Sequence, residues 1–283
     1  MRYTINQFRA EYPDDNACLE AVFQARFGDL TVCPKNGCAD TKFYRVKKRQ
    51  CYACMHCGHQ LHPLADTIFR KSSTSLWNWF YAIYLFSVAK NGVSAKELER
   101  QLGVTYKTAW RMAKQIRLLM AQETGMFTGV VEADETYYGG RRKQSQSYDN
   151  KTAVVGIAEK RGRIKVKAFE GRANSKSVLP YLYANIEPLS VLHTDKSHIY
   201  FKAKETYKHR TVDHGVGQYV SHGVHTNNLE SFWSQLKRSI NGTYHSVSPK
   251  YLQSYVDEFA FRYNHRGGVV YPVLLGRVTK PLQ

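Results

Sequence analysis

The sequence predicts a multidomain α/β protein, and three observations lead to this fold class. All six cysteines of the 283-residue chain lie within the first 57 residues. Residues 67–123 have apolar positions at helical spacing, and after Gly125 runs rich in Val and Ile alternate with helical stretches. We therefore expect three domains, at residues 1–66, 67–124 and 125–283, the last with a mixed sheet and flanking helices.

The charge of the chain favours a polyanionic partner. Lys and Arg number 41 against 23 Asp and Glu, a formal net charge of +18. A small soluble domain needs a net charge of only about 2–8 for solubility. Nucleic acid is the first expectation, and a solubilising surface is the alternative.

The first 30 residues read as a short helical lead-in. Asp14 or Asp15 can cap a helix through NACLEAVFQARFG, and the N-terminus has no apolar leader segment. The most apolar run, LWNWFYAIYLFSVA at 76–89, has 14 residues, fewer than the roughly 20 that span a bilayer. We expect a buried helix there and no membrane contact.

The cysteine cluster predicts a structural zinc site. CPKNGC at 33–38 and CYACMHCGH at 51–59 offer two pairs of thiols at spacings that can reach one tetrahedral ion. The predicted ligands are Cys33, Cys38, Cys54 and Cys57. Cys51 is a rival ligand because CYAC has the same spacing, and His56 and His59 are weaker rivals. A metal-free cluster of thiols is the alternative, and Cys18 is expected to be a lone packed thiol.

The stretch at 92–119, GVSAKELERQLGVTYKTAWRMAKQIRLL, predicts a helix-turn-helix. Ser94 with Glu97 forms a capping box, Gly103 allows a tight turn, and Thr105 can cap a second helix. That second helix is basic, and its N-terminal residues stand where base contacts usually arise. The predicted DNA-contacting residues of this helix are Thr105, Tyr106, Lys107, Thr108, Arg111, Lys114 and Arg117. An ordinary helical hairpin with a solvated basic face is the alternative.

Three acids in the last domain suggest a metal site. Asp134 in VEADETYYGG and Asp195 in SVLHTDKS follow apolar strands, and Glu230 lies early in the helical run NNLESFWSQLKR. Carboxylates are hard ligands for Mg²⁺, and two such ions can activate a hydroxyl and stabilise the leaving oxygen of a phosphodiester. Glu132 and Glu135 compete with Asp134, and separate surface acids are the alternative.

These motifs together resemble the Merlin-like insertion-sequence transposases, nearly from end to end. Those proteins join an N-terminal zinc ribbon, a helix-turn-helix and a DDE catalytic domain of ribonuclease-H-like fold. The resemblance makes Asp134, Asp195 and Glu230 the catalytic triad, with 34 residues between the last two. It also makes Lys237, seven residues beyond Glu230, a DNA contact. Some relatives have Asn as the third residue, so Asn227 and Asn228 remain rivals of Glu230.

The resemblance implies a DNA transposase that uses Mg²⁺ or Mn²⁺, with zinc in a structural role. Such an enzyme binds the terminal inverted repeats of its element, cuts the ends and joins the 3′-hydroxyl to target DNA. It acts as a homo-oligomer in the transposition complex and is cytoplasmic, at the bacterial nucleoid. Two other readings stay open: a DNA-binding regulator with an inactive domain, and a metal-dependent nuclease without strand transfer.

Overall fold

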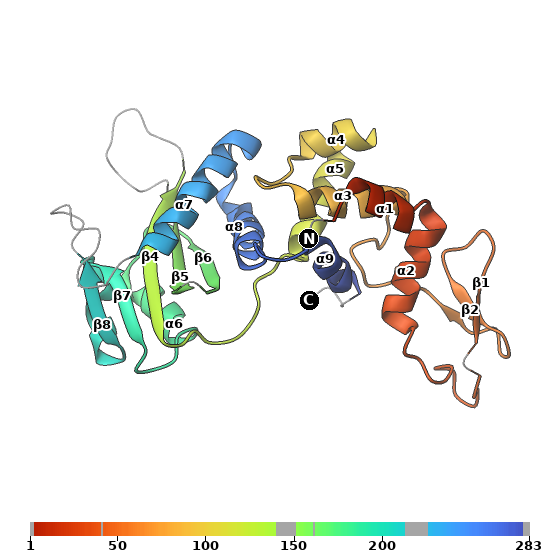
Figure 1. The fold of residues 1–283 in the computed structure, drawn as a ribbon, viewed down its shortest axis with the longest axis horizontal. Coiled ribbons are helices and arrows are strands. Elements are labelled where there is room, and N and C mark those ends of the chain that lie inside the picture. The colour runs from red at the N-terminus through yellow and green to blue at the C-terminus, as the bar shows by residue number, and fades with distance from the viewer. Residues whose placement is uncertain (1–2, 41, 140–150, 161, 213–225, 280–283) are drawn as a thin grey trace. The chain divides into compact units, whose positions relative to one another are not determined.

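The computed structural model describes residues 3–40, 42–139, 151–160, 162–212 and 226–279. The chain forms two compact units, one of Met1–Leu119 with Gly267–Gln283 and one of Met120–Arg266. The sequence grouped residues 267–283 with the α/β domain, whereas the structure assigns them to the first unit. Figure 1 shows the elements of both units. No helix in the described part of the chain is both long and apolar enough to cross a bilayer.

The first unit is helical apart from the ribbon strands. Its helices are α1 (Ile5–Glu11), α2 (Asp15–Phe27), α3 (Leu76–Val88), α4 (Ala95–Leu102), α5 (Tyr106–Leu118) and α9 (Val270–Val278). Asp14 caps α2, accepting hydrogen bonds from the backbone of Asn16 and Ala17 at 2.9 Å each. The apolar run at 76–89 is a buried helix, as predicted, with Trp79 and Phe80 fully enclosed.

An aromatic cluster joins the two ends of the chain within this unit. Phe8 of α1 stacks on Tyr84 of α3, with ring centroids 5.2 Å apart. Tyr271 of α9 stacks on Tyr3 at 4.7 Å and meets Phe8 edge-on at 5.9 Å. Arg277 adds a hydrogen bond of 3.0 Å to the carbonyl of Leu119. These contacts explain why α9 belongs with the first unit.

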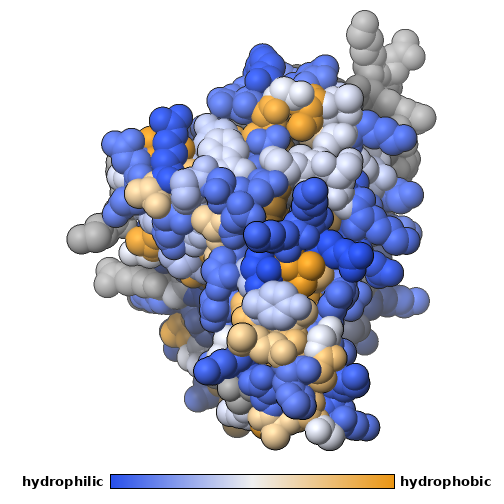
Figure 2. Space-filling view, turned by 90° about the vertical axis from the view of Figure 1, so that its right-hand side faces the viewer, coloured by the Kyte–Doolittle hydropathy of each residue, from blue (hydrophilic) through white to orange (hydrophobic). Residues whose placement is uncertain are grey.

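The cysteine-rich segment forms a small antiparallel sheet in the order β1-β2-β3, with strands β1 (Phe43–Arg45), β2 (Tyr52–Cys54) and β3 (Gln60–Leu61). Tyr52 stacks on Phe23 of α2 with ring centroids 3.8 Å apart, which fixes this ribbon to the helix. Figure 2 shows the surface on this side of the chain as mainly hydrophilic with small apolar areas.

The second unit has a five-stranded mixed sheet in the order β6-β5-β4-β7-β8. The strands are β4 (Val130–Tyr138), β5 (Thr152–Glu159), β6 (Ile164–Phe169), β7 (Val191–Asp195) and β8 (Lys208–Val212). β4, β5 and β6 pair antiparallel, whereas β7 pairs parallel with β4, and β8 pairs parallel with β7.

Helices cover both faces of this sheet (Figure 1). On one face α6 (Ser175–Tyr183) and the 3-10 helix η1 (His198–Glu205) pack against alternate residues of β4 and β5. On the other face lie α7 (Asn227–Ser239), a π-helical turn (Ile240–Tyr244) and α8 (Pro249–Asn264). The side chains of β4 therefore alternate between two buried environments.

Amide side chains cover the outer edge of β6. Gln122 bonds both backbone groups of Val166, at 2.7 Å to the N–H and 2.6 Å to the carbonyl. Asn264 does the same at Ile164, at 2.8 and 2.9 Å. Gln253 accepts from the N–H of Ala168 at 2.8 Å. These side chains occupy backbone groups that an open edge strand would offer to another strand.

Candidate functional site

Asp134 lies in the middle of β4, and Asp195 is the last residue of β7, which pairs parallel with β4. β4 and β7 pair with Val130 opposite Val191 and Glu132 opposite His193. Asp134 and Asp195 each follow by two residues, so they share one face of the sheet. The backbone N–H of Ser197 donates to Asp195 Oδ1 at 3.0 Å. The pairing register thus brings together two of the three predicted acids.

The environment of Asp134 makes its ionised form costly. Burial, and next the negative charge of Glu135, raise the pKa of Asp134 to about 7, and the charge of Asp195 adds to this. A hydrogen bond of 2.9 Å from Trp233 Nε1 to Asp134 Oδ2 acts in the opposite direction. A desolvated carboxylate beside a second acid suits a divalent cation, because the ion would compensate the charge that burial penalises.

Glu132 and Glu135, the two rivals of Asp134, have different hydrogen-bond partners in the structure. Glu132 is 1% exposed and accepts from the backbone N–H of Asn228 at 3.1 Å and from its side-chain amide at 2.7 Å. Glu135 points to the opposite face of β4, where it accepts from the hydroxyl of Tyr200 at 2.6 Å. Burial raises the pKa of Glu135, and the Tyr200 hydrogen bond opposes this shift. Both rivals therefore hold packed elements in place.

Glu230 lies in the first turn of α7 and is partly buried. The hydroxyl of Thr226 donates to Glu230 Oε1 at 3.3 Å. In the described ranges, the acids do not gather into a group of three or more ligand atoms close enough for one ion. Asn228 is engaged with Glu132, Asn227 is exposed at the start of the helix, and Lys237 is exposed near its end.

The four predicted thiols meet at one point in the ribbon. The Sγ atoms of Cys33, Cys38, Cys54 and Cys57 all lie within 4.8 Å of one another, and two of the pairs are 3.7 Å apart. A tetrahedral zinc with Zn–S bonds of about 2.3 Å would hold sulfurs about 3.8 Å apart. The chemistry and spacing of this donor set fit a structural zinc ion.

The rival ligands lie outside this quartet. The Cys51 thiol is directed to Gln60 Oε1 at 3.7 Å. The backbone N–H of His59 lowers the pKa of Cys57 to about 7, so this histidine acts on the cluster through its main chain. Cys18 is fully buried in α2, as expected of a packed thiol, and burial raises its pKa to about 12.

Helices α4 and α5 form the expected pair about a glycine turn. Ser94 caps α4 by accepting from Glu97 N at 3.1 Å, and Thr105 caps α5 by accepting from Thr108 N at 3.3 Å. Gly103 ends α4 with φ +63°, a left-handed conformation that favours glycine. Lys107 and Lys114 are exposed, and Tyr106 is 46% exposed.

Two arginines of α5 make contacts within the first unit. Arg117 is only 4% exposed; its guanidinium donates to the carbonyl of Val93 at 3.4 Å and lies 5.4 Å from the ring centre of Phe86. The predicted DNA contact by Arg117 finds no support in this packing, because the side chain lies inside the unit. Arg111 is partly buried and donates to the carbonyl of Arg70 at 2.8 Å.

Sequence reasoning gave no role to Trp233 or Gly156, and it considered Asn228 only as a rival of Glu230. Asp134 is the cross-strand partner of Gly156, and a Cβ at Gly156 would lie 2.9 Å from two ring atoms of Trp233. A glycine inside the Val-rich run TAVVGIAE was the available signal, because such a glycine often marks a close approach by another element. The basic segment RRKQSQSYDNK at 141–151, which the sequence suggests is a polar loop, lies outside the described residues apart from Lys151.

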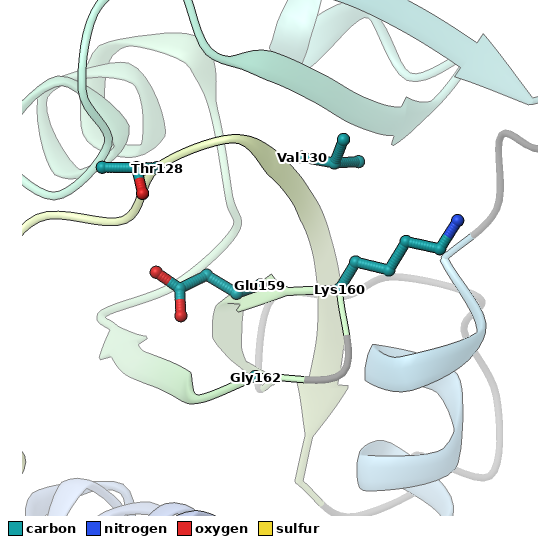
Figure 3. Close-up of a pocket in the computed structure, with 5 residues that line it drawn as sticks. All are labelled: Thr128, Val130, Glu159, Lys160 and Gly162. Carbon is teal, nitrogen blue, oxygen red and sulfur yellow. The ribbon is translucent and has the colours of Figure 1, made fainter.

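A depression of about 610 Å³ lies away from these acids. It is lined by Thr128, Val130, Glu159, Lys160 and Gly162, as Figure 3 shows. These residues lie at or just before the beginning of β4 and at or just after the end of β5, whereas Asp134 lies further along β4. The side chains of Glu159 and Lys160 diverge in the close-up, so this depression does not present converging catalytic groups.

The chain is similar to transposase families over two segments. Residues 126–264 match the family described as ISXO2-like transposase domain, and residues 13–60 match the transposase zinc-ribbon domain. A protein of Halobacterium salinarum named "Uncharacterized protein in transposable element ISH50" is 26% identical over 238 residues, which are 77% of this chain and 79% of that protein. The first match contains Asp134, Asp195 and Glu230, and the second contains the cysteine quartet. The chain therefore carries an ISXO2-like transposase domain at residues 126–264, preceded by a transposase zinc-ribbon domain at residues 13–60.

Proposed function

We propose that this protein is a DDE transposase that binds the terminal inverted repeats of an insertion sequence, cleaves the DNA ends and joins the 3′-hydroxyl to target DNA. The observation that carries the proposal is the pair formed by Asp134 and Asp195 on one face of two adjacent parallel strands. The mixed sheet with helices on both faces supports a ribonuclease-H-like catalytic domain.

Asp134, Asp195 and Glu230 would hold Mg²⁺ or Mn²⁺. When bound, such ions supply activation of water or a 3′-hydroxyl and stabilisation of the leaving oxygen. Asp134 and Asp195 are already adjacent, and Glu230 would join them by a change of its side chain away from Thr226. Cleavage and joining are each an in-line attack on a phosphodiester, so the same acids serve both steps.

DNA would be held by exposed basic and polar groups of α5 and α7. In α5 the exposed groups are Thr105, Tyr106, Lys107 and Lys114, with the half-buried Thr108 beside them, at and after the start of a helix preceded by a glycine turn. Lys237 of α7 is exposed two helical turns beyond Glu230 and would contact the DNA backbone near the cut. The net charge of +18 supports a polyanionic partner. Because two ends must be held together, we expect a homo-oligomer in the active complex.

The test is cleavage of DNA that carries the repeats flanking the gene, with Mg²⁺ or with EDTA. Asp134→Asn, Asp195→Asn and Glu230→Gln should each abolish cleavage and retain DNA binding, because each change removes one ligand charge and preserves shape. Glu170→Gln, at an exposed position, is the matched control.

A second assay supplies DNA with pre-cut ends and measures joining to a target. Joining that needs the three acids would support a transposase, whereas cleavage without joining would indicate a nuclease. DNA binding without either reaction would indicate a regulator. Wild-type cleavage by Glu230→Gln would overturn the assignment of the third acid.

A further inference from the structure

We propose that Trp233 is a positioning residue for Asp134, holding one carboxylate oxygen so that the other is presented to the catalytic cation. This inference rests on the proposed metal site. The indole Nε1 donates to Asp134 Oδ2 at 2.9 Å, so the hydrogen bond engages one oxygen of the pair. A carboxylate held through one oxygen has a defined orientation for its other oxygen.

The indole is itself rigidly placed. Trp233 is 5% exposed and belongs to the apolar cluster formed by α7, α8 and one face of the sheet. Its ring meets that of Phe232 at 5.2 Å and 64°, close to an edge-on contact. A donor that is fixed by packing loses little conformational freedom when it holds an acceptor, which makes it a suitable support for a ligand.

Gly156 makes this close approach possible. It lies on β5 directly opposite Asp134, and a Cβ there would come within 2.7 Å of Leu229 Cδ2 and 2.9 Å of the Trp233 ring. Any larger residue would therefore displace α7 from the strand that carries Asp134. The hydrogen bond from Trp233 to Asp134 on β4 and the absence of a side chain at Gly156 on β5 both allow the Trp233 ring to lie close to the sheet.

A second contact fixes the direction of α7. The buried carboxylate of Glu132 accepts the backbone N–H and the side-chain amide of Asn228, in the first turn of α7. Glu132 and Asp134 lie on the same face of β4, two residues apart. The helix is thus held to β4 at Asn228 and again at Trp233, with Glu230 on the segment between them.

The test measures Mn²⁺ binding to the full chain by calorimetry, without DNA. Trp233→Phe keeps the ring and removes the N–H, and it should weaken Mn²⁺ binding about tenfold or more. In an Asp134→Asn background the same change should have no further effect, because Trp233 acts through Asp134. Trp110→Phe is the control, since Trp110 lies on α5 of the first unit.

The outcomes distinguish the two proposals. Wild-type Mn²⁺ affinity in Trp233→Phe, together with a loss in Asp134→Asn, would overturn the role of Trp233 alone. Undiminished Mn²⁺ binding by Asp134→Asn would overturn the metal site and the positioning role together.

A second measurement does not require a variant of Trp233. In the sequence Trp233 is the sole tryptophan between residues 120 and 266. Its indole N–H signal can be assigned by elimination with Phe variants of Trp77, Trp79 and Trp110. Addition of diamagnetic Mg²⁺ to the wild-type chain should shift that signal, and an unchanged signal at saturating Mg²⁺ would contradict the proposal.

Discussion

The burial of Asp134 lowers the stability of the folded chain when the carboxyl group is ionised, and the same burial favours binding of a divalent cation. The carboxyl group has a pKa of about 7 in the folded chain, against an ordinary value near 3.9 when unfolded. Between these two values the unfolded chain has lost the proton and the folded chain still binds it. The free energy of unfolding therefore falls as the pH rises through this window, by up to about 4 kcal/mol.

We predict that Asp134→Asn is more stable than the wild type at pH 8 in EDTA, because the variant removes this ionisation. At pH 4 and below, the difference should shrink towards zero. Added Mg²⁺ should stabilise the wild type and leave the variant unchanged, since only the wild type retains the full ligand set. Urea unfolding at both pH values measures this, and a variant less stable than wild type at pH 8 would contradict it.

The basic residues of α5 divide into exposed and buried ones, and we predict that they act differently. Lys107→Ala and Lys114→Ala should weaken DNA binding and each lower the salt slope by about 1, because each removes an exposed cation. Arg117→Ala should leave the slope unchanged and lower the melting temperature, since Arg117 packs inside the unit and bonds the Val93 carbonyl. Competition binding at two salt concentrations tests this. A reduced salt slope in Arg117→Ala would indicate that Arg117 does contact DNA.

At the scale of elements, local signals in the sequence were sufficient where the stabilising contacts are themselves local. The caps at Asp14, Ser94 and Thr105, the turn at Gly103 and the Val-rich strands were all predicted and are observed. The strand β8 and the helices α8 and α9 were not assigned. β8 is short and mostly exposed, so it has little apolar periodicity, and α9 is placed by contacts with residues about 270 positions away.

The candidate site shows the same division. The sequence could indicate which acids follow strands, but Glu132, Asp134 and Glu135 differ only in what lies opposite them. Those partners are Asn228, Trp233 and Tyr200, which come from residues 65 to 99 positions further along the chain. The burial of Arg117 could not be predicted from the sequence either, because helical spacing alone does not show which basic residue packs against Phe86.

The edge of β6 offers a test of how amide side chains protect a sheet. Gln253→Leu preserves size and removes the acceptor of the Ala168 N–H and a donor to Asp257. We predict a loss of about 1–3 kcal/mol in the free energy of unfolding, because partly buried polar groups lose their partners. Gln50→Leu, at an exposed position in the ribbon turn, is the control. A loss no greater than in this control would show that the edge bonds contribute little.

Gly156 and Gly276 should respond to alanine with opposite signs. Gly156→Ala should destabilise the second unit by about 1–3 kcal/mol, because the new methyl group overlaps Leu229 and Trp233. At Gly276, inside α9, nothing lies within 4 Å of an added Cβ, so alanine should stabilise the helix by about 0.5–1 kcal/mol. Thermal unfolding of both variants and the wild type measures this. A melting temperature of Gly156→Ala equal to that of the wild type would contradict the predicted steric overlap.

At the scale of the whole molecule, zinc should matter to one unit and not to the other. We predict one zinc per chain, and that Cys54→Ser releases it and unfolds the ribbon, because structural zinc contributes much of the folding free energy of such small sheets. Unfolding followed at Trp233 should remain unchanged, since that residue lies in the second unit. Cys18→Ser should retain zinc, and loss of zinc from Cys51→Ser with retention in Cys54→Ser would identify a different ligand set.

The return of α9 to the first unit has a consequence for synthesis on the ribosome. Tyr271 completes the aromatic cluster around Phe8, so the core around α1 cannot be finished until the much later α9 has been translated. The sequence of the second unit is finished before then and can fold while the nascent chain is still tethered. A prematurely terminated product would thus contain α4 and α5 without the finished core beneath them. Such a fragment would be a substrate for proteolysis rather than a stable folded product.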